Sequence, residues 1–408
     1  MHIRPIFSTL ARHKTAAALI VLEVAISCAI LCNALFIVSQ RLGASNQPSG
    51  IDDKHLVSVR VSGIGKVEQS LARTEEDLQA LRAIPGVSSV TVINQLPFQG
   101  SAWNTGISTE PDFKGITVNA AQYTIAAGGL QTLGLPLIAG RAQQAEDFYT
   151  LEEVASRLQS GQPLAFGLMI NQGLAEKLFP GENAVGKTLY MGSYPLNVIG
   201  VTGPIKRPNT QYGAADYSLM MPMRISYADG GFYLLRVEDP ALREEVMQAA
   251  AATLERLDPN RLVRKPRSFE QQREDYFSAD RDMVSLLLVV SALLLLVTAL
   301  GIVGLVSFWV GQRTKQIGIR RALGATRGQI LQYFLTENVL LVSGGIVLGM
   351  LMTYGLNQWL MGQYALPRLP LYFLPIGAVA LWTLGLLSAY GPARRASLIP
   401  PAVATRST

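Results

Sequence analysis

The segment Gly181 to Thr188 matches a phosphate-binding loop letter for letter. It has the sequence GENAVGKT, which fits the pattern whose backbone N–H groups and lysine hold nucleotide phosphates. That chemistry requires a buried strand before the loop and a helix after it. Here the spacing predicts an amphipathic helix over Asn171–Phe179 before the loop and a β-hairpin from Leu189 onward. Because this order is inverted, we interpret the segment as a helix-to-strand turn. The alternative hypothesis, a nucleotide-using enzyme, has no support in the sequence beyond this motif.

Other residues that could do chemistry are sparse. The three histidines are His2, His13 and His55, and none has a carboxylate or cysteine partner at a recognisable ligand spacing. The two cysteines, Cys28 and Cys32, lie four residues apart in an apolar stretch, where we expect them to pack as small hydrophobic residues. We therefore expect no catalytic residue, no metal site and no cofactor site in this chain.

Four long apolar segments dominate the chain. Each is at least 20 residues long, enough to cross a hydrocarbon core of about 30 Å as a helix. They are Thr15–Val38, Val284–Val310, Ile330–Leu356 and Leu371–Tyr390. The first run is longer than the apolar core of a signal peptide and lacks a small-x-small cleavage site, so we expect an uncleaved span. The pattern predicts a membrane protein with four transmembrane α-helices and a large extracytoplasmic domain between the first and the second.

The basic residues indicate the orientation of these spans. The net charge is +6, and the clusters flank three span ends: Arg4, Arg12 and Lys14; Arg313, Lys315, Arg320, Arg321 and Arg327; Arg394, Arg395 and Arg406. All three clusters lie on one side of the membrane, which the positive-inside rule makes the cytoplasm. Both termini are then cytoplasmic, and the motif at Gly181 lies outside the cell. Because topology accounts for the positive charge, we expect no nucleic-acid partner.

The segment between the first two spans has an α+β pattern. An alternating run, His55–Ser62, precedes helical spacing over Ser70–Ile84, and a second β-rich run follows at Ser88–Leu96. Further on, Pro240–Leu257 has the features of a helix with proline at its start. The charged segment Ser268–Met283 contains no Gly or Pro, which predicts one continuous stalk helix entering the second span. We expect domains at residues 1–39, 40–282 and 283–408.

Two acidic residues lie in or near spans. Glu23 and Glu337 are intramembrane polar candidates, because such residues often mark partner contacts or pathways. The alternative for Glu337 is that it reaches the interface or caps a neighbouring helix. Few other polar residues lie in the spans, so we do not expect a hydrophilic path between them.

The loop between the second and third spans has the sharpest local pattern. Residues 312–330 predict a short amphipathic helix ended by Gly324, which would present Ile317 and Leu323 to a protein partner. The alternative is a basic helix that lies on the membrane surface and serves only the positive-inside rule.

These segments resemble the FtsX/MacB-like ABC transporter permeases. Residues 313–330 are similar to the family motif RxxEIGIRRALGATRxxI, and the glycines from Gly344 to Gly349 and the tail from Tyr390 to Pro400 are also similar. In the outer domain, the segments 133–141 and 170–187 resemble the MacB-like periplasmic core. Two features depart from the family: Gln316 replaces a glutamate, and residues 141–161 form a longer insertion.

The resemblance implies a permease subunit rather than an enzyme. ATP would be bound by a separate ABC ATPase subunit, and the permease would pair with a second permease, identical or paralogous. A coupling helix would contact the ATPase through Gln316, Ile317, Gly318, Ile319, Arg320, Arg321, Ala322, Leu323 and Gly324. The protein would lie in the bacterial inner membrane and export a hydrophobic or peptidic compound from the periplasm, with a periplasmic adaptor and an outer-membrane channel as possible partners. The alternative is a signalling permease that regulates a cell-wall hydrolase or a sensor.

Overall fold

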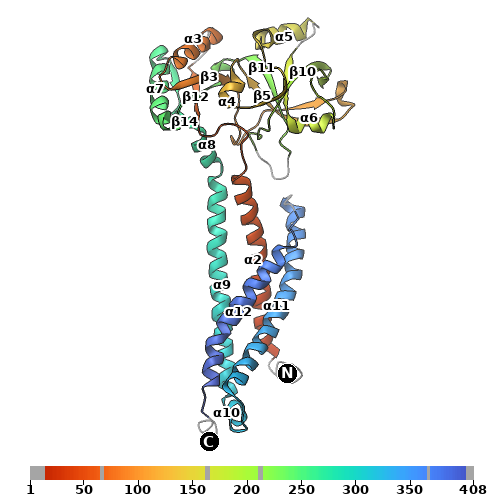
Figure 1. Cartoon of the computed structure of the whole chain (residues 1–408), viewed down its shortest axis with the longest axis vertical. Helices are drawn as coiled ribbons and strands as arrows, with labels where there is room; N and C mark the ends of the chain where they lie inside the picture. The colour runs from red at the N-terminus through yellow and green to blue at the C-terminus, as the bar shows by residue number, and fades with distance from the viewer. Residues whose placement is uncertain (1–13, 65–68, 161–165, 210–214, 365–367, 401–408) are drawn as a thin grey trace. The chain divides into compact units, whose positions relative to one another are not determined.

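The computed structural model describes residues 14–64, 69–160, 166–209, 215–364 and 368–400. The chain divides into two compact units (Figure 1), which we call the helical unit and the α+β unit. The helical unit comprises Met1–Asn46 and Ala279–Thr408, and the α+β unit comprises Gln47–Ser278.

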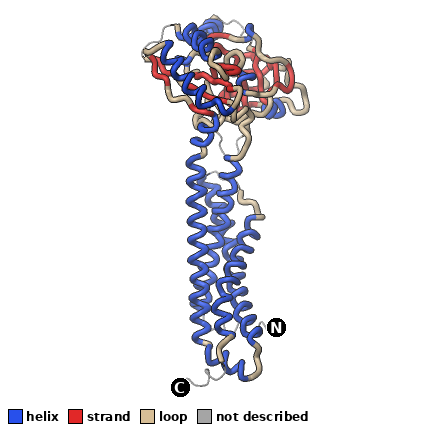
Figure 2. Tube along the Cα trace, turned by 60° about the vertical axis from the view of Figure 1, so that its left-hand side comes forward, coloured by secondary structure: helices blue, strands red, loops and turns tan. Residues whose placement is uncertain are grey.

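Within the described ranges, four helices are long and apolar enough to cross a membrane, so the prediction of four spans is confirmed. They are α2 (Lys14–Ser45), α9 (Ser278–Gln312), α11 (Arg327–Tyr364) and α12 (Phe373–Ser397). A shorter helix, α10 (Thr314–Ala322), connects α9 to α11. Figure 2 shows the four long helices running side by side.

Helix α2 is the most enclosed of the four, because 61% of its apolar 18-residue stretch is buried. It packs mainly on α11, where two glycines let the backbones approach closely. A Cβ added at Gly345 would lie 2.6 Å from Val24 Cβ, and one added at Gly349 would lie 2.5 Å from Cys28 Cβ. Cys28 and Cys32 are both buried in this helical core, as small hydrophobic residues would be.

The α+β unit is built on a 12-stranded mixed sheet, with strand order β14-β1-β12-β3-β5-β4-β9-β10-β8-β11-β7 and β6 paired to β10. Its strands are β1 (Leu56–Val59), β3 (Val87–Ile93), β4 (Asn104–Ser108), β5 (Thr117–Ile125), β6 (Leu137–Gly140), β7 (Tyr149–Thr150), β8 (Gly167–Asn171), β9 (Thr188–Met191), β10 (Tyr194–Thr202), β11 (Ser218–Arg224), β12 (Phe232–Val237) and β14 (Arg267–Ser268). A separate pair joins β2 (Val61–Gly63) to β13 (Arg261–Val263).

Six helices accompany this sheet in the described part of the α+β unit, and several of them pack on its strands. Their bounds are α3 (Ser70–Arg82), α4 (Gly129–Leu133), α5 (Leu151–Gln159), α6 (Gln172–Leu178), α7 (Arg243–Leu257) and α8 (Phe269–Tyr276), and short 3₁₀ turns lie at Pro111–Phe113, Ala145–Asp147, Tyr227–Asp229 and Pro240–Leu242. Helix α3 packs on β3 and α7 on β1, whereas α6 packs on β8, β10 and β11. The α+β pattern predicted from the sequence is therefore confirmed.

The predicted continuous helix over Ser268–Met283 is wrong. Helix α8 ends at Tyr276, and α9 begins at Ser278. The intervening Phe277 leaves helical geometry at ψ 9°. Its side chain is buried against Phe98, with ring centroids 5.1 Å apart. A long-range aromatic contact therefore accompanies the break, in a segment whose local sequence favours an unbroken helix.

Candidate functional site

The loop between the second and third spans folds into α10, at the end of the bundle where α9 ends and α11 begins (Figure 1). Gly324 follows it with φ +99°, a left-handed conformation that glycine adopts without strain. Thr326 and Gln329 then form a reciprocal cap: Gln329 N donates to Thr326 Oγ1 at 3.2 Å, and Thr326 N donates to Gln329 Oε1 at 2.9 Å. A tight turn thus separates α10 from α11, as the sequence predicts.

The faces of α10 differ from the expectation at one residue. Ile317 is 4% exposed and packs against Ile330 and Phe334, so it is not presented to a partner. The outward apolar residues are Ile319, 48% exposed, and Leu323, 83% exposed. At about 100° per residue, position 319 lies almost opposite 317, and position 323 returns to the face of 319. The solvent-facing apolar pair is therefore Ile319 and Leu323.

A buried ion pair anchors the start of α10. Arg313 Nη1 donates to both carboxylate oxygens of Glu337, at 3.0 and 2.8 Å, and their side chains are 8% and 2% exposed. The guanidinium also lies 5.6 Å from the ring of Trp309. Glu337 of α11 thus pairs with the residue that lies between α9 and α10. A partner or pathway role for Glu337, and the alternative that it reaches the membrane interface, stay predictions. Arg313, counted with the topology signal, is a buried structural residue.

Two further arginines tie α10 to its neighbours. Arg321 Nη1 donates to the carbonyl of Ser397 in α12 at 2.6 Å. The guanidinium of Arg320 lies 4.9 Å from the ring centroid of Tyr333 in α11. A cavity of about 160 Å³ lies beside these contacts, with Gln316 in its wall. Helix α10 is thus fixed to three spans and exposes a narrow apolar face.

Glu23 lies within the bundle, where it faces α9. A Cβ added at Gly301 would lie 2.4 Å from Glu23 Oε1, so only glycine leaves room for this carboxyl group. One turn further along α2, the hydroxyls of Ser27 and Thr298 are 2.7 Å apart. These polar groups join α2 to α9. The described contacts therefore place Glu23 at a helix–helix contact; a partner or pathway role stays a prediction.

The phosphate-loop motif has the order predicted for a turn. Helix α6 precedes it and β9 follows it, while Gly181 and Gly186 have φ of +70° and +85°. The N–H of Gly186 donates to Val198 O at 2.8 Å, and Lys187 Nζ donates to Glu182 Oε2 at 2.8 Å. At least these two groups, which a phosphate would need, are engaged within the protein.

One histidine does have a carboxylate partner, contrary to the expectation. His55 Nδ1 lies 2.8 Å from Asp52 Oδ1, and Asp52 also pairs with Arg236. Within the described ranges, no group of three or more His, Cys, Asp or Glu side chains could hold a metal ion. The His55 contact is therefore part of a surface ion-pair network.

Two family models together match nearly all of the described chain. The MacB-like periplasmic core domain matches residues 17–253, and the FtsX-like permease C-terminal domain matches residues 288–401. The second match includes α10 and all of the contacts that anchor it. The outer-domain match includes most of α2 and most of the sheet.

Several named proteins are similar to all or part of this chain. The chain is 26% identical over 86% of its length to "Macrolide export ATP-binding/permease protein MacB" of Agrobacterium fabrum, of which it covers 54%. It is 25% identical over 99% of its length to "Uncharacterized ABC transporter permease YvrN" of Bacillus subtilis, of which it covers 99%. A solved periplasmic region of MacB from Actinobacillus actinomycetemcomitans aligns at 15% identity, covering 55% of this chain and 94% of that one, with a TM-score of 0.35.

The chain spans about half the length of the MacB relative from Agrobacterium and nearly all of YvrN. The resemblance inferred from residues 313–330, from the glycine-rich third span and from the outer-domain segments is confirmed by both domain models. The structure has four candidate membrane helices, with one large α+β unit between the first and the second. The chain belongs to the family of ABC transporter permeases of the MacB/FtsX type.

Proposed function

We propose that this chain is the permease subunit of a mechanotransmission ABC transporter and that a separate ATPase subunit docks on α10. The supporting observation is the exposed pair Ile319 and Leu323 on a helix whose other face is fixed to the bundle. Exposed apolar side chains on a short cytoplasmic helix suit a groove in a protein partner. The arginines around the pair would orient the helix against acidic groups of that partner.

Movement of α10 would pass directly into the spans. Helix α10 is joined to α11 by the packing of Ile317 and by the buried ion pair of Arg313. It is joined to α12 by the hydrogen bond from Arg321 to a backbone carbonyl. The α+β unit is joined to the bundle by the chain at both of its ends, through α2 and α9. Near those ends, Arg41 of α2 forms an ion pair with Asp280 of α9. ATP-driven displacement of α10 would therefore reach the α+β unit through two linked helices.

The orientation that we propose places α10 and both termini in the cytoplasm of a bacterium, with the chain in the inner membrane. Arg394 and Arg395 lie in the last turn of α12 at the α10 end of the bundle, in agreement with the positive-inside rule. The α+β unit would then be periplasmic. We propose a second permease as a partner, and an adaptor and outer-membrane channel for export of a hydrophobic or peptidic compound.

Co-purification of the ATPase subunit tests this function. We expect Leu323→Asp to lose the ATPase, or to lose permease-stimulated ATP hydrolysis, because the change places a charge in an apolar contact. Gln312→Asp is the matched control, because it adds the same charge at an exposed position at the end of α9. It should retain the ATPase. Full assembly and full activity of Leu323→Asp would reduce α10 to a topology signal and refute the proposal.

A further inference from the structure

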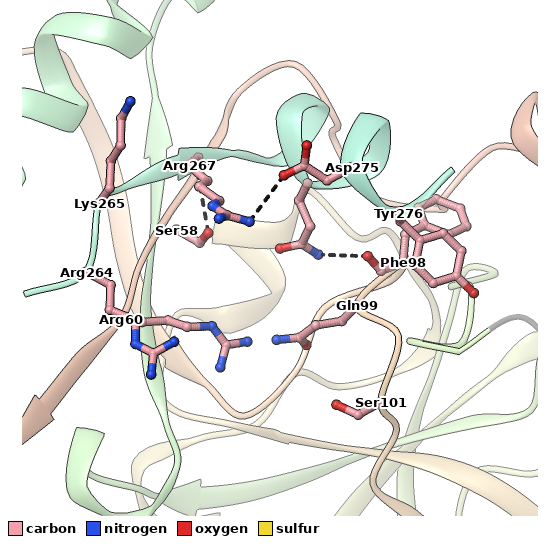
Figure 3. Close-up of a pocket in the computed structure, with 11 residues that line it drawn as sticks. Ser58, Arg60, Phe98, Gln99, Ser101, Arg264, Lys265, Arg267, Asp275 and Tyr276 are labelled. Atoms are coloured by element: carbon pink, nitrogen blue, oxygen red, sulfur yellow. Dashed lines mark hydrogen bonds and ion pairs between the residues drawn. The ribbon is translucent and has the colours of Figure 1, made fainter. Parts of the chain in front are cut away.

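The α+β unit contains an open cavity of about 560 Å³, far in sequence from α10. Its walls come from β1, from the β13–β14 segment, from the loop Phe98–Ser101 and from α8 (Figure 3). Ligand pockets commonly have volumes of about 300–1,000 Å³. We call this cavity the arginine cleft, after the three arginines in its wall: Arg60, Arg264 and Arg267.

Strand pairing brings these arginines together. Side chains alternate along β1, so Val57 and Val59 enter the core while Ser58 and Arg60, the residue just after β1, face the cleft. Arg267 of β14 pairs with Ser58, and the N–H of Arg264 donates to Arg60 O at 2.8 Å. Figure 3 shows the guanidinium groups of Arg60 and Arg264 directed into the same space. The local register therefore gathers positive charge on one face.

The proximity of these positively charged side chains destabilises the fold. Like charges directly opposite one another on neighbouring strands are destabilising. Burial lowers the pKa of Arg60, and the charges of Arg264 and Arg267 lower that pKa further. The lining contains one carboxylate, Asp275, whose Oδ2 lies 3.2 Å from Arg267 Nη1. Among the described residues, no carboxylate forms an ion pair with Arg60 or Arg264. The cleft thus holds excess positive charge.

The Arg60 side chain is held in position. Its guanidinium carbon lies 4.4 Å from the ring centroid of Phe232, a buried residue. Stacking of this kind fixes an arginine while leaving its outer N–H groups available. A fixed guanidinium offers two parallel donors, which match the oxygens of a phosphate or a carboxylate.

The opposite wall also presents donors and is strained. Gln99 Oε1 accepts from Leu96 N at 2.9 Å, so its amide nitrogen faces the cleft as a donor. Phe98 has φ +56°, a left-handed conformation that is costly for an aromatic residue. Gln272 Nε2 holds this loop by donating to Pro97 O at 2.9 Å. Such strain persists where the surroundings enforce it, and it concentrates at ligand sites.

We propose that the arginine cleft binds an oligophosphate group, either of a soluble metabolite or of a lipid headgroup. Three guanidinium groups and an amide donor require a ligand with several acceptor oxygens and more than one negative charge. A single phosphate ester has a charge of about −1.5 to −2 at neutral pH. With Lys265 the lining has four cationic side chains and one carboxylate, an excess of 4 − 1 = 3 positive charges, which two linked phosphates balance better than one. The site shares no residue with α10. The proposal therefore does not rest on ATPase docking.

Titration calorimetry with inorganic pyrophosphate tests this site. The full chain is used in nanodiscs of phosphatidylcholine, which supply no anionic lipid. We expect the double variant Arg60→Gln/Arg264→Gln to weaken binding at least about tenfold. The matched control is Arg82→Gln, which removes one exposed guanidinium at the end of α3, outside the cleft. The control should bind pyrophosphate as the unmodified chain does.

A competition arm distinguishes the two sources. Displacement of pyrophosphate by geranyl diphosphate, a soluble short-chain lipid diphosphate, at a lower concentration than unlabelled pyrophosphate needs would support a lipid headgroup, and weaker displacement would support a soluble oligophosphate. Citrate, a polycarboxylate of similar charge, should bind more weakly than pyrophosphate. No pyrophosphate binding at about 1 mM, tighter citrate binding, or equal loss in the Arg82→Gln control would each overturn the proposal.

A stability measurement separates ligand binding from a structural role. Without ligand, Arg264→Gln should raise the midpoint of thermal unfolding by about 1–4 °C, because it removes a like-charge contact. Replacing a residue that is retained for binding commonly stabilises the fold. A clear fall in the midpoint would assign Arg264 a structural role and contradict the proposal.

Discussion

Arg261 and Asp77 form a buried ion pair with two hydrogen bonds, between β13 and α3. Arg261 Nη1 lies 2.5 Å from Asp77 Oδ2 and Nη2 lies 2.8 Å from Oδ1, with side chains 1% and 2% exposed. Arg261 also donates to Leu254 O in α7, and Tyr233 donates to the same carboxylate from β12. Four elements of the α+β unit therefore meet at Asp77.

Asp77→Ala should destabilise the α+β unit strongly. The change leaves the Arg261 guanidinium buried without a counter-charge, which costs about 3–5 kcal/mol in comparable buried pairs. Thermal unfolding of the full chain measures the loss. The control is Asp275→Ala, which removes an exposed partner of Arg267 and should cost less than about 1 kcal/mol. Equal losses in the two variants would show that the buried pair contributes no more than a surface one.

The pair between Arg313 and Glu337 should show strong coupling in a double-mutant cycle. Glu337→Gln alone leaves a buried cation beside α10, and Arg313→Gln alone leaves a buried carboxylate. The double variant removes both charges, so we expect it to be more stable than the sum of the single losses predicts, by about 0.5–3 kcal/mol. Unfolding in detergent micelles, followed by tryptophan fluorescence, provides the comparison. Strictly additive losses would contradict a direct interaction.

Asp147 gives the segment that follows β6 a pH-dependent anchor. Arg141 donates two hydrogen bonds to this carboxylate, at 2.6 and 2.9 Å, and they hold its pKa below the usual range. Because the pKa is lower in the folded state, the contact stabilises the protein above the unfolded pKa of about 3.9. The stabilisation is lost as the pH falls through the folded pKa.

Asp147→Asn should therefore lower stability at neutral pH, and the difference from the unmodified chain should shrink as the pH falls below about 4. Glu153→Gln, in α5 of the same insertion, is a suitable control because Glu153 only caps Thr150 N at 2.7 Å on the surface. Urea unfolding at several pH values measures both. A deficit for Asp147→Asn that stays constant down to pH about 2 would contradict the linkage.

Much of the fold follows from local pattern. The β-rich run predicted at Ser88–Leu96 contains most of β3, Val87–Ile93, and the helix predicted at Ser70–Ile84 is α3, which ends at Arg82. In α3 the buried residues Leu78 and Leu81 have the spacing of one helix face. The four spans follow from hydropathy, which depends on no tertiary contact.

Other features depend on contacts between distant residues. Strand β4, Asn104–Ser108, was not predicted; it contains Gly106 and is fixed by its pairing with β5. The break at Phe277 reflects packing on Phe98, more than 170 residues earlier. In the candidate site, the turn and the helix were predictable from Gly324 and the amphipathic spacing. The inward face of Ile317 was not, because the partner surface of α11 and α12 decides it. Spacing gives no signal for the pair between Arg313 and Glu337.

The central place of α2 has a consequence for how this protein is made. Its closest partner, α11, approaches it at Gly349, which contacts Cys28. The ribosome adds 349 − 28 = 321 residues between these two positions, which takes about 16–64 s at about 5–20 residues per second. Until then Gly345 and Gly349 are absent, so Val24 and Cys28 of α2 lack the neighbours against which they are buried in the finished bundle. The first span made therefore completes its main packing, against α11, only after most of the chain has been synthesised.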